Sequence, residues 1–102
     1  MTATTRWDAA DHIDDDREAA AYLAAALEDG EIEDVRNALG AIVRARGVSA
    51  VAKKAALSRQ TVHVAGGQTG NPTLETVLAV VKALGFKLTV LDEEGEADQR
   101  AA

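Results

Sequence analysis

The sequence predicts an all-α fold of about five helices followed by one C-terminal β-strand. Apolar residues recur at helical spacing through residues 17–84, and capping residues and glycines divide that stretch into five segments. Over 86–91, Phe86, Leu88 and Val90 then alternate with Lys87, Thr89 and Leu91, as in a strand. We predict a single small domain over 17–91, preceded by an N-terminal arm, 1–16, and followed by an acidic disordered tail, 92–102.

The first two helices are predicted over 17–28 and 31–46. Three aspartates stand before the first helix, where negative charge suits a helix N-terminus, and Gly30 ends it. The second opens with acidic residues and closes with basic ones, which also suits the helix dipole. Their apolar residues at helical spacing are Ala19, Tyr22, Leu23, Ala26 and Leu27, then Ile32, Val35, Leu39, Ile42 and Val43.

Two short helices are predicted next, capped by Ser49 and Ser58 and spanning residues 49–65 together. Ala56, Leu57 and Ser58 form a three-residue turn between them, and Gly66 and Gly67 end the second helix. Such a pair is the pattern of a helix-turn-helix, whose second helix enters the major groove of DNA. This turn commonly has glycine in place of Ala56, and a left-handed alanine costs on the order of 1 kcal/mol.

The last helix is predicted to start at Asn71 and Pro72 and to end at Gly85. A lone strand over 86–91 cannot satisfy its own backbone, so it must pair with a copy of itself, with the N-terminal segment or with a partner protein. We expect a homodimer in which this strand pairs with its symmetry mate, or in which the apolar face of the last helix makes the contact. The strand residues assigned to the dimer contact are Phe86, Leu88 and Val90.

Charge is sorted along the chain, although the net charge is only -6. Residues 1–35 carry 2 basic and 11 acidic side chains, residues 36–91 carry 8 and 1, and residues 92–102 carry 1 and 5. The basic centre is the electrostatic footprint of a phosphate-binding surface. The acidic leader is suited to a basic protein partner, which it would attract.

Several function classes have little support. The chain has no cysteine, no signal peptide and no long apolar run, so we expect a cytoplasmic protein that does not enter a membrane. Asp11, His12 and the aspartates 14–16 lack calcium-loop spacing, which argues against a metal site. Ser58 and His63 lie about 140° apart around a helix, so no catalytic pair forms. We expect neither an enzyme nor a cofactor.

The stretches that carry a family resemblance are AIVRARGVSAVAKKAALSRQTV and GNPTLETVLAVVKALGFKL, with WDAADHI and AAYLAAALEDG before them. They resemble the HigA-type antitoxins, also called addiction-module antidote proteins. The resemblance implies a Cro/C1-type, lambda-repressor-like helix-turn-helix that binds double-stranded operator DNA and represses its own operon. It also implies neutralisation of a co-encoded RelE/ParE-like toxin, which is usually a ribonuclease that cleaves mRNA.

The resemblance places a recognition helix on Arg59, Gln60, Thr61 and His63, capped by Ser58. Arginine pairs with guanine, glutamine pairs with adenine, and threonine contacts the thymine methyl group. Phosphate contacts are expected from basic and polar residues around the motif. These are Arg44, Arg46, Lys53, Lys54 and Asn71. Where the family tends to have a basic residue and a leucine, this chain has Val64 and Gly66, so one basic contact and one core leucine are missing.

The toxin contact is expected in the acidic leader. Its candidate residues are Trp7, Asp8, Asp11, Ile13 and Tyr22. Trp7 has a second interpretation, in which it pins the arm to the protein's own core. Two other functions stay open: a stand-alone helix-turn-helix repressor with no toxin partner, and a protein-interaction module that has lost DNA binding.

Overall fold

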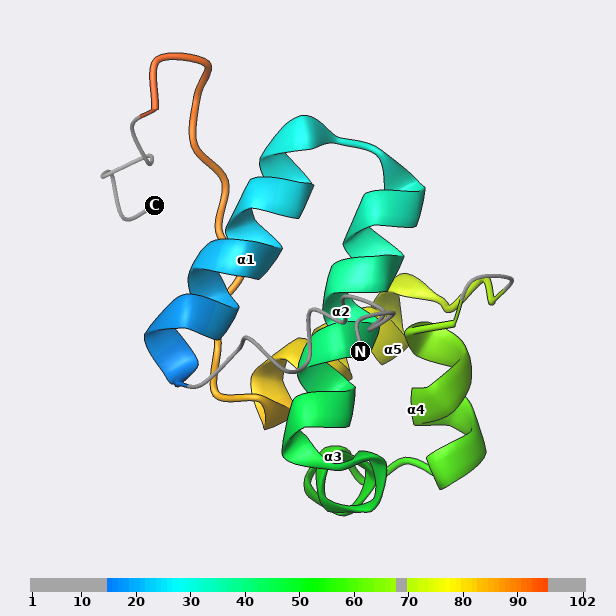
Figure 1. Cartoon of the computed structure of the whole chain (residues 1–102). Coiled ribbons are helices and arrows are strands. Elements are labelled where there is room, and N and C mark those ends of the chain that lie inside the picture. The colour runs from blue at the N-terminus through cyan, green and yellow to red at the C-terminus, as the bar shows by residue number, and fades with distance from the viewer. Residues whose placement is uncertain (1–14, 68–69, 96–102) are drawn as a thin grey trace, which may run out of the picture.

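The computed structural model describes residues 15–67 and 70–95, which form five helices (Figure 1). The predicted arm 1–16 and tail 92–102 therefore lie largely outside the described residues. The helix count and the all-helical class agree with the sequence prediction. The helices are α1 (Asp16–Asp29), α2 (Ile32–Arg46), α3 (Val48–Ala55), α4 (Arg59–Ala65) and α5 (Leu74–Ala83).

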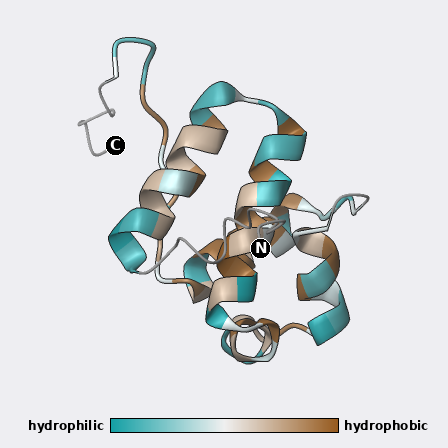
Figure 2. Cartoon of the chain, viewed as in Figure 1, coloured by the Kyte–Doolittle hydropathy of each residue, from teal (hydrophilic) through white to brown (hydrophobic). Residues whose placement is uncertain are grey.

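Helices α1 and α2 form an antiparallel hairpin. Asp15 caps α1, because its carboxylate accepts a hydrogen bond of 2.8 Å from the Glu18 amide. Gly30 ends the helix in the left-handed conformation, with φ at 82°. Ala19 and Leu23 are buried against α2, whereas the turn between the helices is hydrophilic (Figure 2). Among the described helices, α1 packs on α2 alone.

Helix α2 is the centre of the fold, since it contacts α1, α3 and α4. Its second half is buried without interruption from Ala38 to Val43. No polar or charged side chain is buried in the described part of the chain, so apolar packing alone forms the core. The buried cluster consists of Ala19, Leu23, Ala38, Leu39, Ile42, Val43, Val51, Ala52, Val62, Val80, Val81 and Leu84.

A three-residue turn, 56–58, joins α3 to α4. Ala56 adopts the left-handed conformation, with φ 59° and ψ 42°, and among the described non-glycine residues it alone has positive φ. The Leu57 amide donates a hydrogen bond of 3.0 Å to the Ala52 carbonyl, which closes the end of α3. The turn therefore keeps its left-handed residue although alanine stands where glycine is common.

Two predicted helix starts are wrong. Helix α3 begins at Val48 after Gly47 and has no side-chain cap, so Ser49 lies inside its first turn. Helix α5 begins at Leu74, and its cap is Thr73, whose hydroxyl accepts a hydrogen bond of 3.1 Å from the Thr76 amide. The predicted cap was Asn71, but the hydroxyl of Thr73, one residue after Pro72, is the one used.

The strand predicted over 86–91 does not form. Phe86 packs partly against the core, the residues after it are exposed, and only Leu91 makes a single β-bridge. The alternation in this segment had predicted a strand, but the described chain is otherwise helical and provides no neighbouring strand for a ladder. A search of the described helices found none with the length and apolar character needed to span a membrane.

The left-handed backbone of Ala56 gives a stability prediction. Replacing Ala56 with glycine removes the steric cost of the Cβ, and we expect the free energy of unfolding to rise by about 0.5–1 kcal/mol in urea titrations. Ala55→Gly is the matched control: that residue is helical, so the change should lower stability by about 1 kcal/mol. A loss of stability in both variants would contradict the assignment.

Candidate nucleic-acid interface

The start of α4 is fixed by a side-chain cap. Ser58 has extended backbone angles, and its hydroxyl accepts a hydrogen bond of 3.0 Å from the Thr61 amide. The two hydroxyl oxygens of Ser58 and Thr61 also lie 2.8 Å apart in a second hydrogen bond. These bonds hold the first turn of α4, and they engage both hydroxyls locally. The predicted cap at Ser58 is thus confirmed.

One side of α4 is buried and the other is open. Val62 and Ala65 belong to the buried residues of the helix. Arg59, Gln60 and His63 are exposed and line one open hollow together with Val48, the first residue of α3. The structure therefore brings three of the predicted recognition residues onto a single surface. Val48 was missed by the sequence analysis because an apolar residue at a helix start carries no signal of a polar site.

The end of α4 is set by contact with α2. The helix stops at Ala65, as predicted, and Gly66 follows it. A Cβ built on Gly66 would lie 2.5 Å from the Gly40 Cα, and one built on Gly40 would lie 2.4 Å from the Gly66 carbonyl oxygen. Only glycine at both positions allows this approach of two backbones. Gly66 thus has a packing role in addition to ending the helix.

The loop that leads to α5 is tied back to α2. The Arg36 guanidinium donates a hydrogen bond of 2.5 Å to the Gly70 carbonyl. A Cβ on Gly70 would lie 2.0 Å from the Val64 carbonyl oxygen, so the loop runs against the last turn of α4. Asn71 follows this anchored residue and is exposed. Its position beside the end of α4 is compatible with the predicted phosphate contact.

The predicted phosphate-contacting residues do not share one surface. Arg46 forms an ion pair with Asp16, and its guanidinium lies 6.0 Å from the centre of the Phe86 ring. Arg46 therefore connects the end of α2 to the start of α1 and to the start of the segment that follows α5. Arg44 and Lys53 are exposed on α2 and α3.

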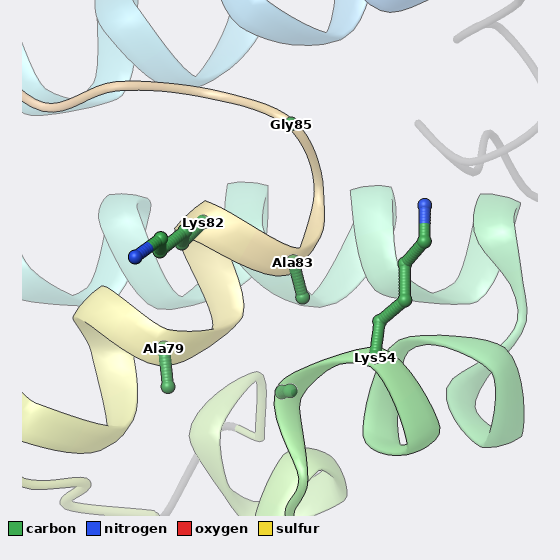
Figure 3. A pocket seen from close by; sticks show the side chains of 6 residues that line it. Lys54, Ala79, Lys82, Ala83 and Gly85 are labelled. Atoms are coloured by element: carbon green, nitrogen blue, oxygen red, sulfur yellow. The ribbon is translucent and has the colours of Figure 1, made fainter.

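Lys54 belongs to a different surface. It lines a groove between the ends of α3 and α5 with Lys82, away from the hollow that contains Arg59 (Figure 3). Lys82 was also missed by the sequence analysis. It lies far along the chain from the helix-turn-helix pattern, so only tertiary structure places it on the same groove as Lys54.

The remaining candidate residues are distributed unevenly. Trp7, Asp8, Asp11 and Ile13 lie outside the described residues, whereas Tyr22 packs against the core from α1. Of the residues assigned to the dimer contact, Phe86 is partly buried, and Leu88 and Val90 are exposed at 40% and 81%. Within 15–67 and 70–95, no group of three histidine or acidic residues is arranged to hold a metal ion.

Comparison with known proteins identifies the family of this small helical chain. A family model described as "Probable addiction module antidote protein" matches residues 3–92. An uncharacterised protein of Haemophilus influenzae is 40% identical over 84 residues, which cover 82% of this chain and 87% of that protein. The chain belongs to the addiction-module antidote family. No solved structure matches it.

The cap of α4 gives the prediction for this site. Ser58→Ala removes the acceptor for the Thr61 amide, and we expect unfolding in urea to become easier by about 1 kcal/mol. Ser49→Ala is the control, because Ser49 is a solvent-exposed residue of α3 that caps no helix. The free energy of unfolding of this variant should change little. Equal losses in the two variants would argue against the capping role of Ser58.

Proposed function

We propose that this antidote-family chain is a DNA-binding antitoxin of a type II toxin–antitoxin module. In this proposal α3 and α4 act as a lambda-repressor-like helix-turn-helix on the operator of its own operon, as in HigA-type antitoxins. A homodimer represses transcription and also neutralises a RelE/ParE-like toxin. The family assignment supports the antidote role and therefore favours a chain with a toxin partner over a stand-alone repressor.

The observation that carries the DNA-binding proposal is the common surface of Arg59, Gln60 and His63. All three are exposed on α4, directly after the capped turn from α3, while the opposite side of the helix is buried. Arginine offers two parallel donors to guanine, and glutamine pairs with both adenine groups in the major groove. Arg59 and Gln60 are the proposed base contacts. Thr61, half-buried with its hydroxyl engaged, contributes its methyl group to a thymine contact.

Phosphate contacts are proposed around this surface. Lys53 and Arg44 are exposed basic residues on the neighbouring helices, and Asn71 follows the loop segment anchored by Arg36. Ser58 and His63 add contacts at the two ends of the exposed face. Arg46 is left out because it is paired with Asp16. Lys54 is left out because it lines the separate groove.

The toxin-binding proposal rests on charge. Helix α1 and the first turn of α2 expose a set of carboxylates: those within residues 28–34 lie around the hydrophilic hairpin turn, and those of Asp16 and Glu18 lie at the other end of α1 (Figure 2). The set consists of Asp16, Glu18, Glu28, Asp29, Glu31, Glu33 and Asp34. A basic ribonuclease would be drawn to this surface. Trp7, Asp8, Asp11 and Ile13 extend it in the proposal, and Tyr22 offers the exposed part of its ring.

Arg59→Ala tests the base contact. The test compares binding to two duplexes: the native site from upstream of the chain's own gene, and the same site with the contacted guanine replaced. We expect the variant to lose about 1–3 kcal/mol of the difference in binding free energy between them. Lys82→Ala removes the same charge from the separate groove and should keep the preference. Fluorescence anisotropy over a salt series measures both. An unchanged preference would remove Arg59 from the base contacts, and no binding even at low salt would refute DNA binding.

Charge reversal on the α1–α2 turn tests the toxin contact. Asp29→Lys combined with Glu33→Lys should slow association with the toxin from the neighbouring reading frame by about tenfold at low salt, because steering depends on opposite charge. Glu75→Lys on α5 is the control and should leave the rate nearly unchanged. Biolayer interferometry with immobilised toxin gives the rates. Equal rates in all variants would contradict an electrostatic toxin contact through this turn.

A further inference from the structure

The segment after α5 is the most exposed apolar stretch among the described residues. Residues 87–95, here called the C-terminal arm, are exposed throughout. Leu88, Val90 and Leu91 are 40%, 81% and 50% exposed, and Asp92, Glu93 and Glu94 follow them directly. Leaving three large apolar side chains within four residues exposed to water is unfavourable. The arm is therefore suited to a surface that presents apolar groups to residues 88–91 and basic groups to residues 92–94.

A groove with this character lies on the same molecule. It runs between the ends of α3 and α5, and small residues line it: Ala55, Ala79, Ala83 and Gly85. We call it the alanine groove. Lys54 and Lys82 stand on either side of it, one from each helix, and Ala79 and Ala83 project from the same side of α5 (Figure 3). The groove holds about 490 Å³ and no acidic side chain lines it.

The arm and the alanine groove are complementary in both shape and charge. Small side chains leave room for the bulky leucines and valine of the arm. The two lysines provide counter-charges for the carboxylates that follow. The groove is an open surface hollow, so an extended segment can lie along it.

The arm of the same copy is directed away from its own groove. The Phe86 amide bonds to the Val81 carbonyl at 3.1 Å, and the Phe86 ring lies under the Arg46 guanidinium. From there the chain runs along α1 toward the α1–α2 turn (Figure 1). The described residues therefore leave the groove open in the single chain, so a segment of another molecule can occupy it.

We propose that the alanine groove receives the C-terminal arm of a second copy of this chain. In a two-fold symmetric dimer each copy gives one arm and accepts one, so two identical contacts form together. Leu88, Val90 and Leu91 pack over the alanines, and Asp92, Glu93 and Glu94 face Lys54 and Lys82. This dimer does not depend on DNA or toxin binding, and it assigns the arm to a groove rather than to a paired strand.

Two charge-reversed chains test the exchange. The groove variant carries Lys54→Glu and Lys82→Glu, and the arm variant carries Asp92→Lys, Glu93→Lys and Glu94→Lys. Each alone sets like charges against each other in both contacts, so we expect the dimer dissociation constant to rise by about tenfold or more relative to the natural chain. Sedimentation equilibrium on the full chain gives this constant.

Mixing the two variants separates this dimer from others. In a mixed pair both contacts regain opposite charges, so the equimolar mixture should dimerise nearly as well as the natural chain. A single chain with all five reversals should also dimerise. Lys53→Glu, next to the groove but outside its lining, is the control for Lys54→Glu and should leave the dissociation constant unchanged. Circular dichroism of each variant checks that the helices are retained.

Three results would overturn the proposal. A monomeric natural chain across the accessible concentrations would mean that no second copy occupies the groove. Dimers that persist in both variants would place the interface elsewhere, such as the exposed Leu74 and Leu78 of α5. Failure of the mixture to recover dimers, with helices retained, would show that the arm and the groove do not contact each other.

Discussion

The position of α4 depends on the contact between the backbones of Gly40 and Gly66. Neither residue has room for a Cβ, so the middle of α2 and the end of α4 meet without side chains between them. Val62 and Ala65 are then buried in the core. With that side buried, the side chains of Arg59 and Gln60 extend from the solvent-exposed side of the helix. A close approach inside the protein thus determines what the short helix presents outside.

Much of the fold was predictable because its signals are local. Gly30 and Ser58 mark helix ends through backbone freedom and a capping hydroxyl, and both act as predicted. The failures involve choices that local sequence leaves open. Thr73 rather than Asn71 caps α5, and alternation after Phe86 does not make a strand where the described residues provide no neighbouring strand.

The candidate site was predictable where its residues are close in sequence. The family resemblance assigned Arg59, Gln60 and His63 to one recognition helix, and all three follow a single cap within that helix. Arg46 and Lys54 were beyond such reasoning, because their surroundings are built by Asp16, Phe86 and Lys82 from distant parts of the chain. The sorted charge indicated which stretch is basic, but tertiary packing decides which of its cations share a surface.

Among the described helices, α1 packs on α2 alone, through Ala19, Leu23 and their neighbours, and Arg46 adds an ion pair at its start. Its detachment would leave the contacts among α2, α3, α4 and α5 in place. Local opening of this kind requires less free energy than global unfolding, so we expect amide hydrogens in α1 to exchange with solvent sooner than those in α2. The acidic helix α1 is thus the part that can unfold while the helices that carry the basic residues stay folded.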